Sequence, residues 1–271
     1  MKKIMVSVAP VSAADTEIIP EKIAADVYEC YKLGASMVHL HVRDAHGKLT
    51  PDLTLLQETV ELIKAKCDIV IEISTGGVSD LNIVDRCAPC YPDYVEFNSL
   101  NVGSVNLGKS VYCNPIDDVE YCVQKILENG KRPEIEVFEL GMINTVRELD
   151  EKYGFVKPIF FALVFGHGGE MPATPGALRH MVDYLYECFP KEIALWGYTQ
   201  AGRKDWDMMK RALEQGASSI RIGFEDSDYI DPDHRADNNA QIVATGVDLV
   251  RSLGMEPMTP DEVRALAGLK P

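Results

Sequence analysis

Long apolar runs are absent from this chain of 271 residues. No stretch approaches the roughly 18 uninterrupted apolar residues that a membrane-spanning helix requires. The first residues, MKKIMVSVAPVSAAD, carry lysines before an apolar run, as a signal peptide does, but the run is short and Pro10 interrupts it. The sequence therefore predicts a first strand here, no membrane partner and a cytoplasmic protein.

Positive charge is also scarce. Lys and Arg number 27 against 42 Asp and Glu, which leaves a net charge of −15. Such a surface repels both the backbone of nucleic acids and anionic lipids, so neither is an expected partner. Small anionic substrates are not excluded, because one cationic pocket can override the global sign.

Paired cysteine motifs are nearly missing. The seven cysteines are scattered and odd in number, which is typical of reduced cytosolic proteins and not of a disulfide framework. Cys87 and Cys90 form a CxxC, but a zinc ribbon needs a second such pair, and a redox pair lies at the start of a helix. This pair follows a predicted helix and precedes a strand, so we expect a structural role.

No GxGxxG run follows the first strand, which disfavours a dinucleotide-binding sheet. Instead, short β-rich apolar runs alternate with amphipathic stretches such as Leu53–Lys66, Val119–Asn129 and Asp237–Leu253. Eight such units without a linker predict a single TIM-barrel domain, a (β/α)8 fold over residues 1–271, with a doubly wound open sheet as the alternative. The predicted strands are Ile4–Ala9, Met37–Arg43, Ile69–Ser74, Tyr94–Asn98, Glu134–Phe138, Ile159–Val164, Ala194–Tyr198 and Ser219–Ile222.

The second predicted strand combines two histidines with an arginine. Strand side chains alternate, so His39, His41 and Arg43 share one face and point toward the barrel mouth, where TIM-barrel sites lie. Two imidazoles at this spacing can bind one Zn²⁺ and leave a position open for substrate, with Arg43 beside it to bind that substrate. The alternative is a pair of core histidines held by hydrogen bonds.

The last predicted strand offers a third metal ligand. Arg221 and Glu225 share a face, so Glu225 can complete a His₂Glu set with the two histidines. Asp226 can pair with Arg221 through a bidentate contact. A solvated loop at Glu225 and Asp226 is the alternative.

Polar residues also follow the third and fourth strands. In Ser74-Thr75-Gly76-Gly77, glycine allows backbone N–H groups to approach an anion closely, although a plain turn has the same composition. Ser74, Thr75 and Gly76 are therefore candidates for substrate binding. Ser99 and Asn101 are further candidates, because their segment is too polar for a mere connector.

Two later segments complete the predicted mouth. The fifth strand carries Glu134, Glu136 and Glu139, and at least one of these carboxylates should face the pocket. The loop at 166–172 after the sixth strand is glycine-rich, so Gly168 is a candidate for a flexible lid or cofactor clamp.

Together these segments resemble the β-keto acid cleavage enzymes, a family whose best-known member acts on 3-keto-5-aminohexanoate in lysine fermentation. The resemblance extends over nearly the whole chain, in family order. Its carrying runs are GASMVHLHVRDAHGKLTPD (34–52), EISTGG (72–77), NSLNVGSVNLG (98–108), RPEIEVFELGM (132–142), GHGGEMPATP (166–175), IRIGFEDS (220–227) and NNAQIV (238–243).

The resemblance implies a zinc-dependent acyltransferase. By motif match, His39, His41 and Glu225 hold one Zn²⁺, which binds the keto acid and stabilises its enolate. The Arg221–Asp226 pair removes the C2 proton, and the carbanion attacks acetyl-CoA. After CoA transfer within the adduct and retro-Claisen cleavage, the products are acetoacetate and a new acyl-CoA.

The same match assigns supporting roles. Ser74 and Ser99 match positions that hold substrate oxygens, and Glu136 matches a carboxylate of the same pocket. The family's habit also implies a homotetramer.

The chain departs from the lysine-pathway enzyme at three loops. Its first loop lacks the glutamate suited to a substrate amino group, and Asp15 is the nearest substitute. Glu170 replaces a usual glycine. After the seventh strand, Arg203 and Lys204 are candidates to meet CoA phosphates, with a solvated helix start as the alternative. The acyl group accepted is thus open, and 3-keto-5-aminohexanoate is one candidate.

Two rival functions fit less well. A metal-dependent hydrolase of amidohydrolase type needs HxH on the first strand and more histidines later, where only His167 is suitably placed. A non-catalytic zinc- or ligand-binding barrel would not need Arg221 and Asp226 beside the ligands.

Overall fold

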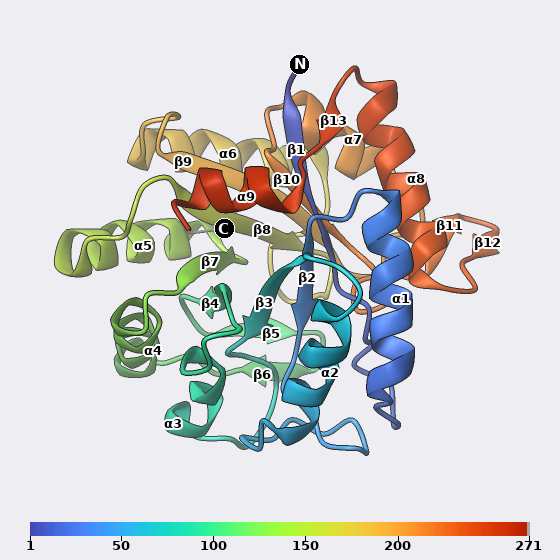
Figure 1. Cartoon of the computed structure of the whole chain (residues 1–271). Coiled ribbons are helices and arrows are strands. Elements are labelled where there is room, and N and C mark those ends of the chain that lie inside the picture. The colour runs from blue at the N-terminus through green and yellow to red at the C-terminus, as the bar shows by residue number, and fades with distance from the viewer. Residues whose placement is uncertain (270–271) are drawn as a thin grey trace.

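Eight parallel strands close into a barrel in the computed structural model, which describes residues 1–269 (Figure 1). Hydrogen bonding joins the last barrel strand to the first, with Arg221 in register with Ser7. The predicted (β/α)8 barrel is therefore confirmed. In barrel order, the strands are β1 (Lys3–Val8), β2 (Met37–Leu40), β3 (Val70–Ser74), β4 (Phe97–Asn101), β7 (Arg132–Val137), β8 (Ile159–Phe165), β9 (Ala194–Gln200) and β10 (Ser219–Ile222).

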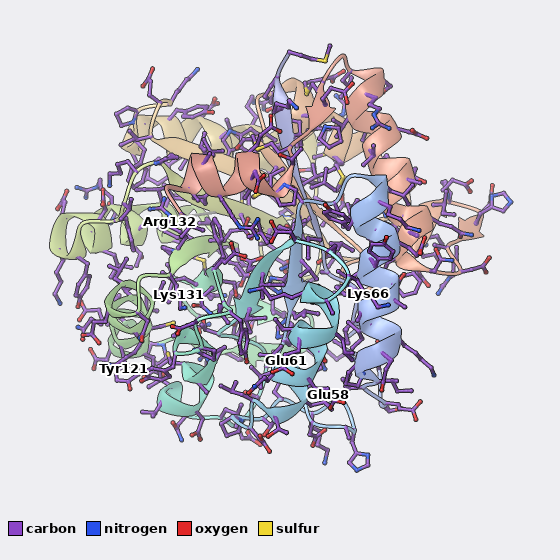
Figure 2. The ribbon with its side chains drawn as sticks, viewed as in Figure 1. Glu58, Glu61, Lys66, Tyr121, Lys131 and Arg132 are labelled. Atoms are coloured by element: carbon purple, nitrogen blue, oxygen red, sulfur yellow. The ribbon has the colours of Figure 1, made fainter. Side chains whose placement is uncertain are left out.

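Amphipathic helices surround this sheet. On α2, Leu56, Val60 and Ile63 are buried, whereas Glu58 and Glu61, both labelled in Figure 2, are exposed. This one-sided burial attaches each helix to the barrel. The helices are α1 (Pro20–Leu33), α2 (Thr54–Lys64), α3 (Ile83–Arg86), α4 (Ile116–Glu128), α5 (Leu140–Tyr153), α6 (Pro175–Cys188), α7 (Asp207–Glu214), α8 (Asn239–Ser252) and α9 (Pro260–Ala267), with a 3₁₀ turn at Ala88–Cys90.

The barrel interior changes from apolar to polar along its axis. An apolar layer fills the amino-terminal ends of the strands, and Val263 and Ala267 of α9 pack against it. Figure 1 shows α9 lying across the barrel. The site must therefore open at the carboxyl end of the strands, as is usual for this fold. The apolar layer contains Met5, Met37, Val70, Phe97 and Phe160.

Some strand limits differ from those predicted. β2 ends at Leu40, because the following loop folds back on itself with hydrogen bonds between Asp44 and Lys48, so Arg43 lies beyond the strand. β4 begins at Phe97 instead of Tyr94, because a turn closed by Val95 N–H and the Pro92 carbonyl precedes it. As a result, Ser99 and Asn101 belong to β4 itself.

Short strands outside the barrel were not predicted. A hairpin of β5 (Val105–Leu107) and β6 (Ser110–Tyr112) turns at Gly108, whose φ of +59° lies in the left-handed region. A second hairpin pairs β11 (Tyr229–Asp231) with β12 (His234–Arg235), and β13 (Glu256–Pro257) pairs with β1.

The seven cysteines carry free thiols. Cys87 and Cys90 are fully buried between α3 and β4, and contact with Cys122 together with burial raises the pKa of both thiols. No helix within residues 1–269 has the length and apolar character needed to cross a bilayer.

Candidate active site

Two histidines, His39 on β2 and His41 directly after it, project into the barrel mouth. Their rings lie edge to face with centroids 5.2 Å apart. Nδ1 of His39 lies 2.9 Å from Oε2 of Glu72, and Nδ1 of His41 lies 3.2 Å from the carbonyl oxygen of Gly76. A carbonyl only accepts, so His41 carries its proton on Nδ1 and presents the lone pair of Nε2 to the mouth.

Glu225 faces the same point from the loop after β10. Its Oε1 lies 3.4 Å from Nε2 of His41 and 3.8 Å from Nε2 of His39. The three ligand atoms lie within 4.8 Å of one another, which no other group of three His, Cys, Asp or Glu side chains in residues 1–269 achieves. Ligands about 2.0–2.1 Å from a tetrahedral Zn²⁺ lie about 3.3–3.4 Å apart. The predicted His₂Glu set is thus brought together with spacing close to what zinc requires.

The protonation states favour a cation between these atoms. Burial, aided by Arg221, lowers the pKa of His39 to about 4, so its ring is neutral. Burial alone would raise the pKa of Glu225, but its interactions with His41 and with the Arg221 guanidinium outweigh burial and hold that pKa well below its usual range. Two imidazole lone pairs and a carboxylate therefore converge on one point.

Arg221 connects the carboxylates of the site. It forms two hydrogen bonds to Asp226, of 2.7 and 3.1 Å, and its Nη atoms also lie 3.3 Å from Glu136 and from Glu225. Burial opposes the charge of Arg221, but the carboxylates, led by Asp226, hold its pKa well above the ordinary value. Arg221 and Asp226 are thus paired, as predicted, and the guanidinium of Arg221 stays protonated.

Hydroxyl groups from β3 and β4 line the floor. Ser99 Oγ donates to Ser74 Oγ at 3.1 Å, and Ser74 Oγ also accepts from the Gly76 N–H at 3.1 Å. The hydroxyl of Thr75 donates to the Ser99 carbonyl instead, and the Asn101 amide oxygen accepts from Gly103. Ser74 and Ser99 thus pair at the site, whereas the polar groups of Thr75 and Asn101 hold the backbone.

These residues open into a cavity of about 660 Å³. Its lining includes His41, Arg43, Ser74, Glu136, Arg221, Glu225 and Asp226, together with the apolar side chains of Leu49, Leu107, Tyr112, Phe138 and Val164. Arg43 donates to the Gly47 carbonyl at 2.6 Å, which holds its side chain at the rim. A neighbouring hollow of about 470 Å³ shares Asp226 and contains Asp15.

The loop after β8 is pinned in place. The Gly108 N–H of the β5–β6 hairpin donates to the Gly168 carbonyl at 2.6 Å, and a Cβ added to Gly169 would lie 2.7 Å from Asn106. This contact holds His167 in the cavity wall, where Nδ1 lies 3.4 Å from the buried Glu170 carboxylate. In this structure the loop predicted as a lid packs against the β5–β6 hairpin and contributes His167 to the cavity wall.

Arg203 lies apart from the cavity lining. Its side chain is 2% exposed and stacks on Trp206 with 3.7 Å between guanidinium carbon and ring centroid. Burial lowers the pKa of Arg203 to about 10. Lys204 is exposed beside it.

Sequence reasoning missed Glu72, which is fully buried below His39. Burial raises the pKa of Glu72 to about 8, and burial with the nearby Glu72 carboxyl raises that of Glu134 well above its usual range. A signal existed, because Glu72 shares strand parity with Ser74 and must face inward.

Comparisons with known proteins identify the family of this chain. A family model described as beta-keto acid cleavage enzyme matches residues 4–269. The chain is 35% identical to a 3-keto-5-aminohexanoate cleavage enzyme of Fusobacterium nucleatum over 92% of this chain and 89% of that protein. It is 30% identical to a 3,5-dioxohexanoate:acetyl-CoA acetone transferase of Paraburkholderia graminis, over 99% and 96% of the two chains.

The fold comparison points the same way. The structure of apo ObcA superposes with a TM-score of 0.76 at 21% identity, covering 93% of this chain and 65% of ObcA, which supports the barrel fold alone. The family model and the sequence relatives both match nearly the whole chain. The chain therefore belongs to the β-keto acid cleavage enzyme family.

Proposed function

We propose that this protein is a zinc-dependent acyltransferase that converts a β-keto acid and acetyl-CoA into acetoacetate and a new acyl-CoA. The observation that carries the proposal is the convergence of His39, His41 and Glu225 beside the Arg221–Asp226 pair. A zinc ion bound there would supply Lewis acidity to the oxygens of the keto acid. The names of the relatives, which include acetyl-CoA-dependent transferases, support the same reaction class.

Asp226 is the proposed general base. Its carboxylate lines the cavity and accepts the C2 proton of the keto acid, while the bidentate contact with Arg221 fixes its orientation. The C2 carbanion then attacks the thioester carbonyl and displaces CoA thiolate. The thiolate attacks the original ketone carbon, the C2–C3 bond breaks, and C2 regains a proton from Asp226.

The serine pair is proposed to hold a substrate oxygen. The Ser99 hydroxyl donates to Ser74, and the Ser74 hydroxyl makes only a long contact of 3.5 Å to the Gly76 carbonyl, so its proton can turn to an acceptor in the cavity. Glu136 forms an ion pair with Arg221 and compensates part of the positive charge of its guanidinium. CoA phosphates are proposed to lie near Lys204, at the exposed end of the segment after β9.

The cavity favours an uncharged acyl end over an ammonium group. Among the described residues lining it, the carboxylates of Glu136, Glu225 and Asp226 all contact Arg221, and Asp80 is exposed at the rim. Asp15 lines the other hollow and accepts from the Ser12 N–H at 2.9 Å. We therefore propose that 3-ketohexanoate is a better substrate than 3-keto-5-aminohexanoate, which shares its carbon skeleton.

The test is an acetoacetate assay with purified protein, acetyl-CoA and a panel of β-keto acids that includes this pair. Activity should disappear with chelator and return with Zn²⁺. Absence of acetoacetate across the panel, with zinc bound, would favour a non-catalytic barrel. Light scattering tests the further proposal that the protein is a homotetramer.

A further inference from the structure

One fully buried carboxyl group of the barrel takes no part in the proposed reaction. Glu72 lies on β3, in register with His39 on β2, and is 0% exposed. Its Oε2 lies 2.9 Å from Nδ1 of His39, and its other polar neighbour is the carboxyl group of Glu134 on β7. Within residues 1–269, the only ion-pair partner of Glu72 is His39. Burying a carboxyl group without a cationic partner is costly, so its placement needs an explanation.

The hydrogen-bond pattern fixes the direction of the contact. Nη1 of Arg221 lies 3.4 Å from Nε2 of His39. A guanidinium has only donors, so Nε2 must be the accepting nitrogen and Nδ1 must carry the proton. Nδ1 of His39 therefore donates to Glu72, and the lone pair of Nε2 points at Glu225.

The two histidines of the site are thus supported differently. His41 donates to the peptide carbonyl of Gly76, whereas His39 donates to a carboxyl group. An ionised carboxyl acceptor fixes the ring orientation and makes the opposite nitrogen a stronger donor of its lone pair, and a cation on that nitrogen favours the ionised form. This difference makes His39 the better-supported ligand.

We propose that Glu72 is a positioning residue that holds His39 in the Nδ1–H tautomer and so sets the metal affinity of the site. The inference rests on the metal site of the proposed function. It assigns to Glu72 the strengthening of metal binding, through a hydrogen bond from His39 that does not involve substrate. Replacing such a partner typically costs about 10–100-fold in metal affinity.

The first experiment measures Zn²⁺ and Co²⁺ affinity by chelator competition in Glu72→Gln and Glu72→Met. Glutamine keeps an acceptor oxygen, so we expect a loss of about tenfold, whereas methionine removes the acceptor and should cost about 100-fold. The Co²⁺ absorption spectrum should shift in both variants. The matched control is Glu120→Gln, which removes a carboxylate paired with Lys152 on the surface of α4 and should leave affinity unchanged.

The second experiment keeps the inference testable if a variant does not fold. Nitrogen-15 shifts of the His39 ring in the metal-free wild-type protein should show a proton on Nδ1 and a lone pair on Nε2. The opposite tautomer would overturn the proposal, as would unchanged affinity in Glu72→Met or equal losses in Glu120→Gln. A wild-type protein that binds no metal would instead overturn the proposed function, while the tautomer measurement would still decide the role of Glu72.

Discussion

Arg221 and Asp226 lie side by side at the barrel mouth, with Nη2 2.7 Å from Oδ1 and Nε 3.1 Å from Oδ2. Both Asp226 oxygens therefore already accept a hydrogen bond before any substrate binds. A carboxylate held in this way keeps one orientation, and its remaining lone pairs face the cavity that it lines.

Asp226→Asn should keep the metal but slow turnover. The amide cannot accept the C2 proton, and a general base typically contributes about 10²–10⁴-fold. Turnover in the acetoacetate assay and metal content by elemental analysis are the two measurements. Asp233→Asn, at an exposed position in the turn between β11 and β12, is the matched control. Wild-type turnover in Asp226→Asn would show that another group is the base.

His41→Ala should lose metal and activity together. Removing one of three ligands leaves a site that cannot compete with a chelator, and Nε2 of His41 is the ligand atom nearer to Glu225. Elemental analysis after dialysis against a weak chelator checks the metal, and His46→Ala, an exposed histidine, serves as control. An active, metal-free His41→Ala would contradict the zinc proposal.

Gly76→Ala should disturb the metal site through His41, whose Nδ1 contacts the Gly76 carbonyl. A Cβ at this position would lie 1.5 Å from the hydroxyl oxygen of Tyr112 and 2.8 Å from its ring carbon. Either the buried Tyr112 ring or the loop whose Gly76 carbonyl accepts from His41 must therefore shift. We expect weaker Zn²⁺ binding and a lower melting temperature. Gly141→Ala, where nothing lies within 4 Å, should leave both nearly unchanged or raise stability by up to about 1 kcal/mol.

Adding Tyr112→Phe to Gly76→Ala should restore only part of the loss, because it removes the closer contact and leaves the ring carbon in place. Equal behaviour of Gly76→Ala and Gly141→Ala would mean that Tyr112 moves freely.

The core of the site was predictable because strand alternation and barrel topology are strong local rules. Parity along β2 placed His39 and His41 inward, and parity after β10 placed Glu225 beside them. The end of β2 was not predictable, because the turn after Val42 that removes Arg43 from the strand depends on pairing with Leu49. The position of the loop after β8 could not be predicted from the sequence either. Its contact with the β5–β6 hairpin joins segments about 60 residues apart, and such a contact leaves no local signal in the sequence.

Stability of the metal-free protein should fall as pH rises from about 6.5 to 8. Burial raises the pKa of Glu72 to about 8 and that of Glu134 well above its usual range, so the folded protein keeps protons that the unfolded chain has lost above about pH 4.5. Stability from a raised pKa is present below the unfolded value and is lost as pH rises through the folded one, with a slope of about 1.4 kcal/mol per pH unit for each proton.

The window from pH 6.5 to 8 isolates this effect. His39, whose pKa burial lowers to about 4, gives the opposite slope, but only between about pH 4 and 6.5, where the unfolded histidine is charged and the folded one is not. Urea unfolding of chelator-treated protein at several pH values is the measurement. Glu134→Gln should flatten the slope because it removes one of the two retained protons, whereas the exposed control Glu58→Gln should not. A slope in Glu134→Gln equal to that of the wild type would show that the pair does not hold these protons.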